Sequence, residues 1–177
     1  MGLVYENLDA ETRRLMVAEI DMDRADQSMY VSNYLNEVGA GVWPDLTREA
    51  ARVGSDESLA NELSQKRLLK TEVQRRKPSG GFTTARVPVT APETLSEAQF
   101  NMYYMRAMAV RASNEGMALQ VYRAKAVVSP RSSSQALIDT LIDPQLLLEE
   151  LRRTKGVEPS VEMPLPNSGL CVRLIPR

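Results

Sequence analysis

The stretch from residue 97 to residue 115 constrains the fold most, because it predicts a helix that is apolar on almost every side. At about 100° per residue, Phe100, Tyr103 and Val110 lie on one wide face, and Met and Ala residues fill much of the rest. Only Arg106 and Ser113 share a clearly polar side. Such a helix must be covered by other elements nearly all round, so we expect it to form the core of the domain.

The sequence also marks both ends of this helix. Two overlapping capping boxes begin at Thr94 and Ser96, and Gly116 stands where a left-handed residue ends a helix. After Gly116 the apolar period changes to two, which predicts a strand from about 118 to 128 that stops at Ser129-Pro130.

Similar signals place the other elements around this unit. We expect an α+β fold over a single domain, 1–177, in which the central helix packs on a small, mostly antiparallel sheet with short helices around it. Gly39-Ala-Gly41 and Ser132–Gln135 predict loops. The remaining elements are predicted as helices at 10–27, 44–53, 56–70 and 144–155 and a strand at 169–175.

A basic segment interrupts this pattern between residues 66 and 86. It contains seven Lys and Arg residues and one acid, Glu72, and Pro78-Ser-Gly-Gly81 breaks any helix within it. We interpret 71–92 as an extended basic arm or exposed loop. Long segments of this kind are commonly functional or disordered, so the alternative is a flexible loop that its charge keeps soluble.

Further cations cluster near the central helix in the sequence. Arg111 falls on the aromatic face of the helix. Either its aliphatic part packs on a tyrosine ring while its guanidinium reaches water, or its guanidinium binds an anion. We expect Arg123 to form a salt bridge with a protein carboxylate, either of the same chain, such as Asp139 or Asp143, or of a neighbouring subunit, and phosphate is the alternative partner. The candidate interaction residues are Arg75, Arg76, Lys77, Arg86, Arg111, Arg123, Lys125 and Arg131.

The residue types that are missing limit the chemistry. The chain has no histidine, which removes Ser-His-Asp and Cys-His catalysis and the usual zinc ligand sets. Its one cysteine, Cys171, forms no intrachain disulfide and favours a reducing compartment. We expect no cofactor. The acids Asp21, Asp23 and Asp26 match a calcium loop incompletely, and we interpret them as a solvated helix face.

The sequence contains no apolar N-terminal region of the signal-peptide kind and no run of about 18 apolar residues. We therefore expect no signal peptide and no membrane contact. We expect the protein to be cytoplasmic or to belong to a particle that is assembled in the cytoplasm.

Six motifs are spread along nearly the whole chain: YENLDAETRRLMVAEI (5–20), VPVTAPETL (87–95), FNMYYMRAMAVRA (100–112), VYRAK (121–125), IDPQLLLEELR (142–152) and PNSGLCVRL (166–174). Together they resemble a family of small, uncharacterised bacterial and prophage-encoded proteins. The family has no known activity, so the resemblance implies no catalytic residues. It implies a phage-like or particle-associated role, in which repeated subunits lay extended arms on their neighbours.

Three functions fit these observations. The first is a non-enzymatic structural subunit that assembles with further copies of itself or with other subunits. The second is a nucleic-acid-binding protein that uses the segment 66–86, although a pI of about 5.7 and the scarcity of aromatics near the cations oppose it. The third is a carboxylate–metal enzyme that uses the acids of 19–26 or Glu149 and Glu150.

Overall fold

The computed structural model describes residues 2–129, 131–157 and 163–177. They form an α+β fold, as predicted. The elements in chain order are α1 (Ala10–Ala25), α2 (Glu37–Val53), α3 (Asp56–Gln65), β1 (Glu72–Arg76), β2 (Phe82–Arg86), α4 (Ala91–Glu115), β3 (Ala118–Arg123), α5 (Ser132–Ala136), β4 (Leu141–Ile142), α6 (Pro144–Thr154) and β5 (Leu170–Ile175).

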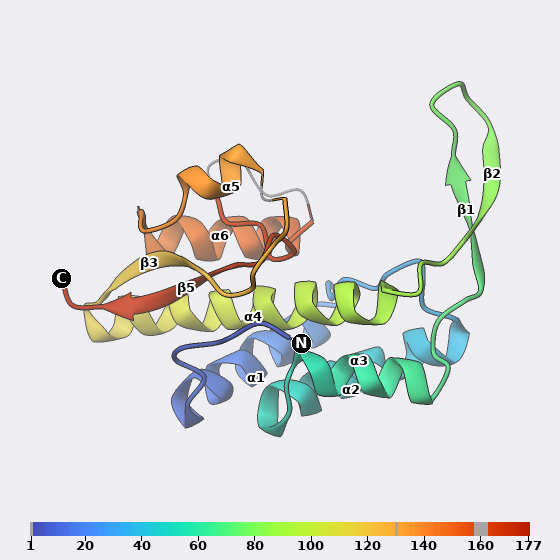
Figure 1. Cartoon of the computed structure of the whole chain (residues 1–177). Coiled ribbons are helices and arrows are strands. Elements are labelled where there is room, and N and C mark those ends of the chain that lie inside the picture. Colours follow the sequence, from blue (N-terminus) through green and yellow to red (C-terminus); the bar gives the residue numbers. More distant parts are fainter. Residues whose placement is uncertain (1, 130, 158–162) are drawn as a thin grey trace.

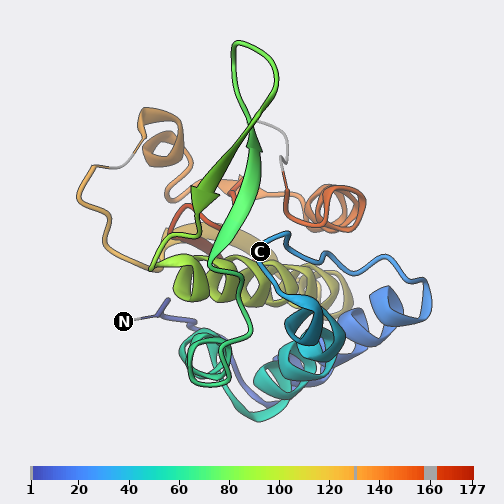
Figure 2. The ribbon, with the colours of Figure 1, turned by 90° about the vertical axis from the view of Figure 1, so that its right-hand side faces the viewer.

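The long helix α4 is the centre of the molecule. Helices α1, α2 and α3 lie along one side of it, and α6 and the sheet of β3, β4 and β5 lie along the other (Figure 1). The view along α4 shows these two layers on either side of the helix (Figure 2). Phe100, Tyr103, Ala107, Met108, Val121, Leu170 and Val172 are all buried, whereas Val110 on the predicted apolar face is only half-buried.

Helix α4 begins earlier than its capping boxes predict. It starts at Ala91 with Pro92 in its first turn, and its N-cap residue Thr90 makes no side-chain capping bond. Proline is well placed there, because the first turn of a helix leaves its N–H groups without intrahelical partners. The predicted stop is confirmed, since Gly116 adopts a left-handed conformation with φ of 67°. At 25 residues, α4 is about 37 Å long.

Helix α2 corrects the prediction of a loop at residues 39–41. Asn36 caps this helix by accepting a bond of 2.8 Å from the Gly39 N–H, so the two glycines lie inside it and Pro44 does not start it. A Cβ on Gly39 would lie 2.2 Å from the Leu68 carbonyl oxygen. Because Gly39 has no side chain, α2 can pack closely against the backbone at Leu68. The glycine serves this close contact within a helix and does not mark a loop.

The helices beside α2 follow the sequence more closely. Asp9 caps α1, with its Oδ1 accepting a bond of 3.0 Å from the Thr12 N–H. Ser55 caps α3, which ends at Gln65 rather than near 70. Trp43 is fully buried, as expected of a packing residue, and its indole N–H donates to the Tyr30 carbonyl at 3.1 Å.

The C-terminal layer is an antiparallel sheet with the strand order β4–β3–β5. Val121 lies opposite Val172, and β3 ends at Arg123, earlier than predicted, because its ladder with β5 stops at Leu170. The polar stretch after Arg131 forms the short helix α5, which the sequence predicts as a loop. The predicted strand end at Pro130 lies outside the described residues. No helix of the described residues is both long and apolar enough to cross a membrane.

Candidate interaction surface

The basic segment is an ordered β-hairpin rather than an unpaired arm or loop. Strands β1 and β2 pair antiparallel, with Glu72 opposite Arg86 and Arg76 opposite Phe82. Gly80 and Gly81 both have positive φ, which lets the chain turn tightly between the strands. The hairpin projects from the molecule at the end where α4 begins (Figures 1 and 2). Each strand of five residues spans about 17 Å.

The two faces of the hairpin differ. On the inner face Val73 is buried opposite Ala85, and the Arg75 Nη2 donates to the Tyr34 hydroxyl at 3.0 Å. On the outer face Arg76 lies opposite Phe82, whose side chain is 68% exposed. Because its base packs on the domain and is hydrogen-bonded to it, the hairpin presents its outer face to the surroundings in one orientation.

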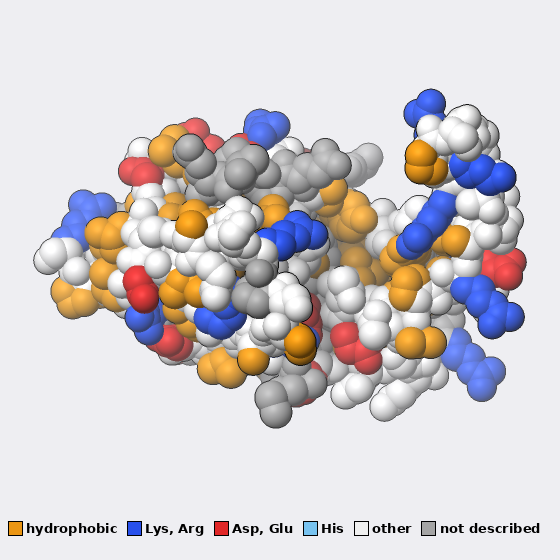
Figure 3. Space-filling model, turned by 45° about the horizontal axis from the view of Figure 1, so that its top comes forward, with side chains coloured by type: hydrophobic (Ala, Val, Ile, Leu, Met, Phe, Trp, Pro, Cys, Tyr) orange, Lys and Arg blue, Asp and Glu red, His pale blue; other side chains and the backbone are white. Residues whose placement is uncertain are grey.

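The cations of the hairpin lack carboxylate partners, unlike most of those in the rest of the chain. Within the described residues, the side chains of Arg76, Lys77 and Arg86 make no ion pair or hydrogen bond. Lys and Arg side chains gather on the projecting part of the molecule in Figure 3. By contrast, nine arginines elsewhere contact carboxylates: Arg14, Arg24, Arg48, Arg52, Arg106, Arg111, Arg152, Arg153 and Arg173.

Charge is therefore segregated along this chain. Residues 66–86 carry seven cations and one acid, a net charge of +6. Because the whole chain has a net charge of −1, the remaining residues carry −7. A projecting basic element on an acidic body is expected to orient an approaching anionic surface toward that element.

The structure does not bring the other predicted cations into one cluster. Arg111 lies between Asp9 and Glu115, each at 2.6 Å, so its guanidinium neither faces only water nor awaits an external anion. The Lys125 ammonium pairs with Glu97. Arg131 is exposed and has no ionic partner in the described residues; it lines a hollow of about 430 Å³ together with Lys125.

The predicted salt bridge of Arg123 with an acid of its own chain is not formed in the described structure. Its guanidinium donates to the Gln135 side-chain oxygen at 2.9 Å and to the Ser168 carbonyl at 3.3 Å, and both acceptors are neutral. Neither Asp139 nor Asp143 is its partner in the described structure. A local amide and a free carbonyl satisfy the guanidinium, which strand alternation alone does not predict.

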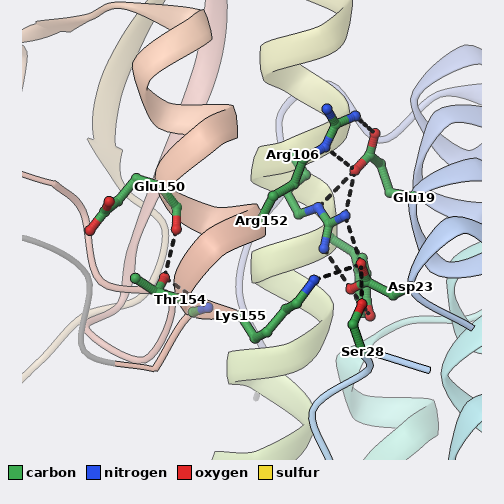
Figure 4. Close-up of polar contacts among 10 residues, drawn as sticks. Glu19, Asp23, Ser28, Arg106, Glu150, Arg152, Thr154 and Lys155 are labelled. Atoms are coloured by element: carbon green, nitrogen blue, oxygen red, sulfur yellow. Dashed lines mark hydrogen bonds and ion pairs between the residues drawn. The ribbon is translucent and has the colours of Figure 1, made fainter. Parts of the chain in front are cut away.

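A buried ion-pair network is the largest feature that the sequence analysis missed. Arg106 is fully buried on α4, although the helical pattern places it on the polar side. Its Nε donates to Glu19 at 2.8 Å, and its Nη1 donates to Asp23 at 2.7 Å. Arg152 and Lys155 approach the same two carboxylates from the end of α6 (Figure 4). The network therefore joins α1, α4 and α6.

This network corrects the interpretation of the acids near the end of α1. Glu19 and Asp23 are buried, so they are not part of a solvated face. Burial acts to raise the pKa of Asp23, but hydrogen bonds from Arg106 and Lys155 outweigh burial and hold the pKa below its usual value. Within the described residues, no group of three potential ligands is placed to hold a metal ion.

An anionic hollow of about 300 Å³ lies beside the start of α4. Asp56 is 2% exposed, and its carboxylate accepts the N–H groups of Leu3 at 2.9 Å and Glu57 at 3.0 Å. No cation of the described residues contacts this carboxylate. Burial raises its pKa, and the nearby Glu97 and Glu57 add to the effect. The full lining is Gly2, Asp56, Glu57, Ala60, Asn61, Glu93, Glu97 and Lys125.

No protein-family model, curated protein or solved structure matches this chain. The resemblance to small prophage-encoded proteins stays a prediction from the motifs.

Proposed function

We propose that this protein is a non-enzymatic assembly subunit, and that the β1–β2 hairpin is the element that docks on a neighbouring copy. The observation that carries the proposal is the projecting hairpin itself, whose outer cations Arg76, Lys77 and Arg86 have no partner in the described chain. Unpaired cations beside an exposed aromatic ring provide both charge and apolar area for a protein contact.

Charge segregation supports a second copy as the partner. The hairpin, residues 72–86, carries four cations and one acid, a net charge of +3, and the rest of the chain carries −4, so the two parts are complementary between copies. The same acidic remainder repels a polyanion, so nucleic acid is the less favoured partner. The motif resemblance supports a repeated subunit of a phage-like particle, in which arms lie on neighbours.

Solution mass tests this proposal. We expect the wild-type chain to form species larger than a monomer, measured by light scattering over a range of concentrations, and we expect high salt to reduce them. Arg76→Gln combined with Lys77→Gln should shift the population toward monomer. The matched control is Arg14→Gln combined with Arg153→Gln, which removes the same charge from exposed sites on the body and should leave the mass unchanged.

Two results would contradict the proposal. In the first, the wild-type chain has the mass of a monomer at every concentration, as the hairpin variant does. The other is a monomer that binds DNA or RNA through the hairpin. In that case the logarithm of the affinity should fall with the logarithm of salt concentration, at a slope of roughly −3 to −4 for four phosphate contacts.

A further inference from the structure

A second hollow, of about 390 Å³, lies against the first turns of α4 and has a mostly apolar lining. Ala91, Leu95 and Gln99 recur at every fourth residue, so their side chains lie on the one face of α4 that forms a wall of this hollow. Chain segments before α2, after α6 and before β5 form the other walls. Small-molecule sites in proteins commonly have volumes of about 300–1,000 Å³, so the hollow is large enough for a small organic ligand.

The side chain of Gln99 is a buried polar group that lines this hollow without a partner. It is 3% exposed, and its side-chain oxygen accepts no hydrogen bond from the described residues. Native structures pair nearly all buried groups of this kind, because an enclosed acceptor without a donor is destabilising. The enclosed oxygen at the wall of a hollow therefore points to a ligand that supplies an N–H or O–H donor.

The charge around the hollow favours an anion. Among the described residues that line it, Arg131 is the cation, and no Asp or Glu is present. Arg131 is exposed and has no ionic partner in the described residues, so its guanidinium is free to bind a ligand. The first turn of α4 also borders the hollow, and Thr90 gives this helix no side-chain cap. The positive end of the helix dipole adds to the attraction of an anion.

We propose that this hollow binds a small carboxylate that carries an N–H donor and an apolar side chain, the chemistry of an N-acyl amino acid. The ligand N–H donates to the side-chain oxygen of Gln99, and the apolar side chain lies against Leu95 and Leu165. The carboxylate bonds to Arg131, because one planar guanidinium matches one carboxylate through two hydrogen bonds. This inference goes beyond the proposed function and does not depend on it.

Titration of the whole chain with N-acetyl-L-phenylalanine tests the assignment. We expect a dissociation constant on the order of 1 mM or lower, which ordinary ligand efficiencies give for a compound of this size. In nitrogen-labelled protein, the side-chain NH₂ signal of Gln99 should shift during the titration. The signal is identified by its absence from the spectrum of Gln99→Met, a variant of similar length without the amide.

Two variants and two altered compounds locate each contact. Arg131→Gln should weaken binding of N-acetyl-L-phenylalanine by at least about tenfold, and Gln99→Met should weaken it by about three- to tenfold. The uncharged N-acetyl-L-phenylalaninamide should bind Arg131→Gln and wild type equally. Hydrocinnamate, which has no N–H group, should bind Gln99→Met and wild type equally. The control is Arg14→Gln, which removes the same charge from an exposed site on α1 and should bind like wild type.

The outcomes that contradict the inference are distinct. Binding of N-acetyl-L-phenylalanine that neither variant weakens would overturn the site, and so would a Gln99 signal that stays in place at ten times the expected dissociation constant. Tighter binding of uridine monophosphate would assign the hollow to phosphate ligands and overturn the carboxylate. We expect Gln99→Met to melt at the temperature of wild type or above it, because an unpaired buried amide is lost. A lower melting temperature would show that the fold already satisfies the amide, which removes the basis of the inference.

Discussion

Replacing Arg106 by methionine tests whether the buried network holds the layers together. Methionine has a similar length and no charge, so Arg106→Met removes the central cation without opening a large cavity. Glu19 and Asp23 then remain buried with less compensation, and breaking a buried pair in this way costs roughly 3–5 kcal/mol. Arg152 and Lys155 still contact the two carboxylates, so we expect a loss near the lower end of that range.

The expected loss is large enough to measure without ambiguity. For a chain of this size, each kcal/mol shifts the melting temperature by about 2–4 °C, which gives a fall of at least roughly 6 °C. Urea unfolding followed by fluorescence gives the free energy directly, because Trp43 is the only tryptophan and is fully buried. The control is Arg153→Met, which breaks an exposed pair with Glu150 and should unfold like wild type.

A second substitution separates the charge from the packing. Arg106→Met combined with Asp23→Asn should recover part of the lost stability, because the carboxylate left without its main partner is neutralised. If Arg106→Met unfolds at the same urea concentration as wild type, the network is replaceable by apolar packing and the reasoning is refuted. If the double variant is less stable than the single one, the loss comes from packing rather than from uncompensated charge.

Three further predictions concern the fold. Gly39→Ala should destabilise it by about 1–3 kcal/mol because the new Cβ would meet the Leu68 carbonyl, whereas Gly41→Ala, in open space on the same helix, should stabilise it by roughly 0.5–1 kcal/mol; urea midpoints of the pair decide this. Met108→Ala should cost about 2–5 kcal/mol in the same assay, and a smaller loss would argue against tight packing there. The folded pKa of Asp23 lies below its ordinary value of 3.8, so its ionised form stabilises the fold above that pH and the gain disappears as pH falls through the folded pKa. Asp23→Asn should therefore lose stability at about pH 7 and lose less below about pH 4, and a gap that stays constant with pH would contradict this.

The sequence predicts the parts of the fold that depend on local chemistry. The stop at Gly116 and the strand near 169–175 follow from short-range signals, and both are confirmed. Asp9 and Ser55, which are residue types that commonly cap helices, cap α1 and α3. The buried face of α4 also follows from its composition. These features can be predicted without knowing which helices and strands pack against one another.

The wrong predictions concern residues whose environment is set by a segment far away in the sequence. Arg106 resembles a surface residue until α1 places Glu19 and Asp23 opposite it, more than 80 positions away. Gly39 resembles a loop residue until Leu68 packs against it. The cations of the hairpin were predicted as candidates, whereas the hollow around Asp56 was not, because it joins segments that are far apart in the sequence.

The central position of α4 has a consequence for folding during synthesis. Helices α1–α3 precede α4 and can cover one side of it as soon as it emerges from the ribosome, but β3, α6 and β5 follow it. The last of these ends 60 residues after Glu115, a delay of roughly 3–12 s at ordinary rates of translation. During that interval an apolar helix face has no cover, so the nascent chain is most exposed to aggregation and to chaperone binding until β5 has been made. Chaperone crosslinking to chains stalled after Arg123 and after Ile175 would measure the difference.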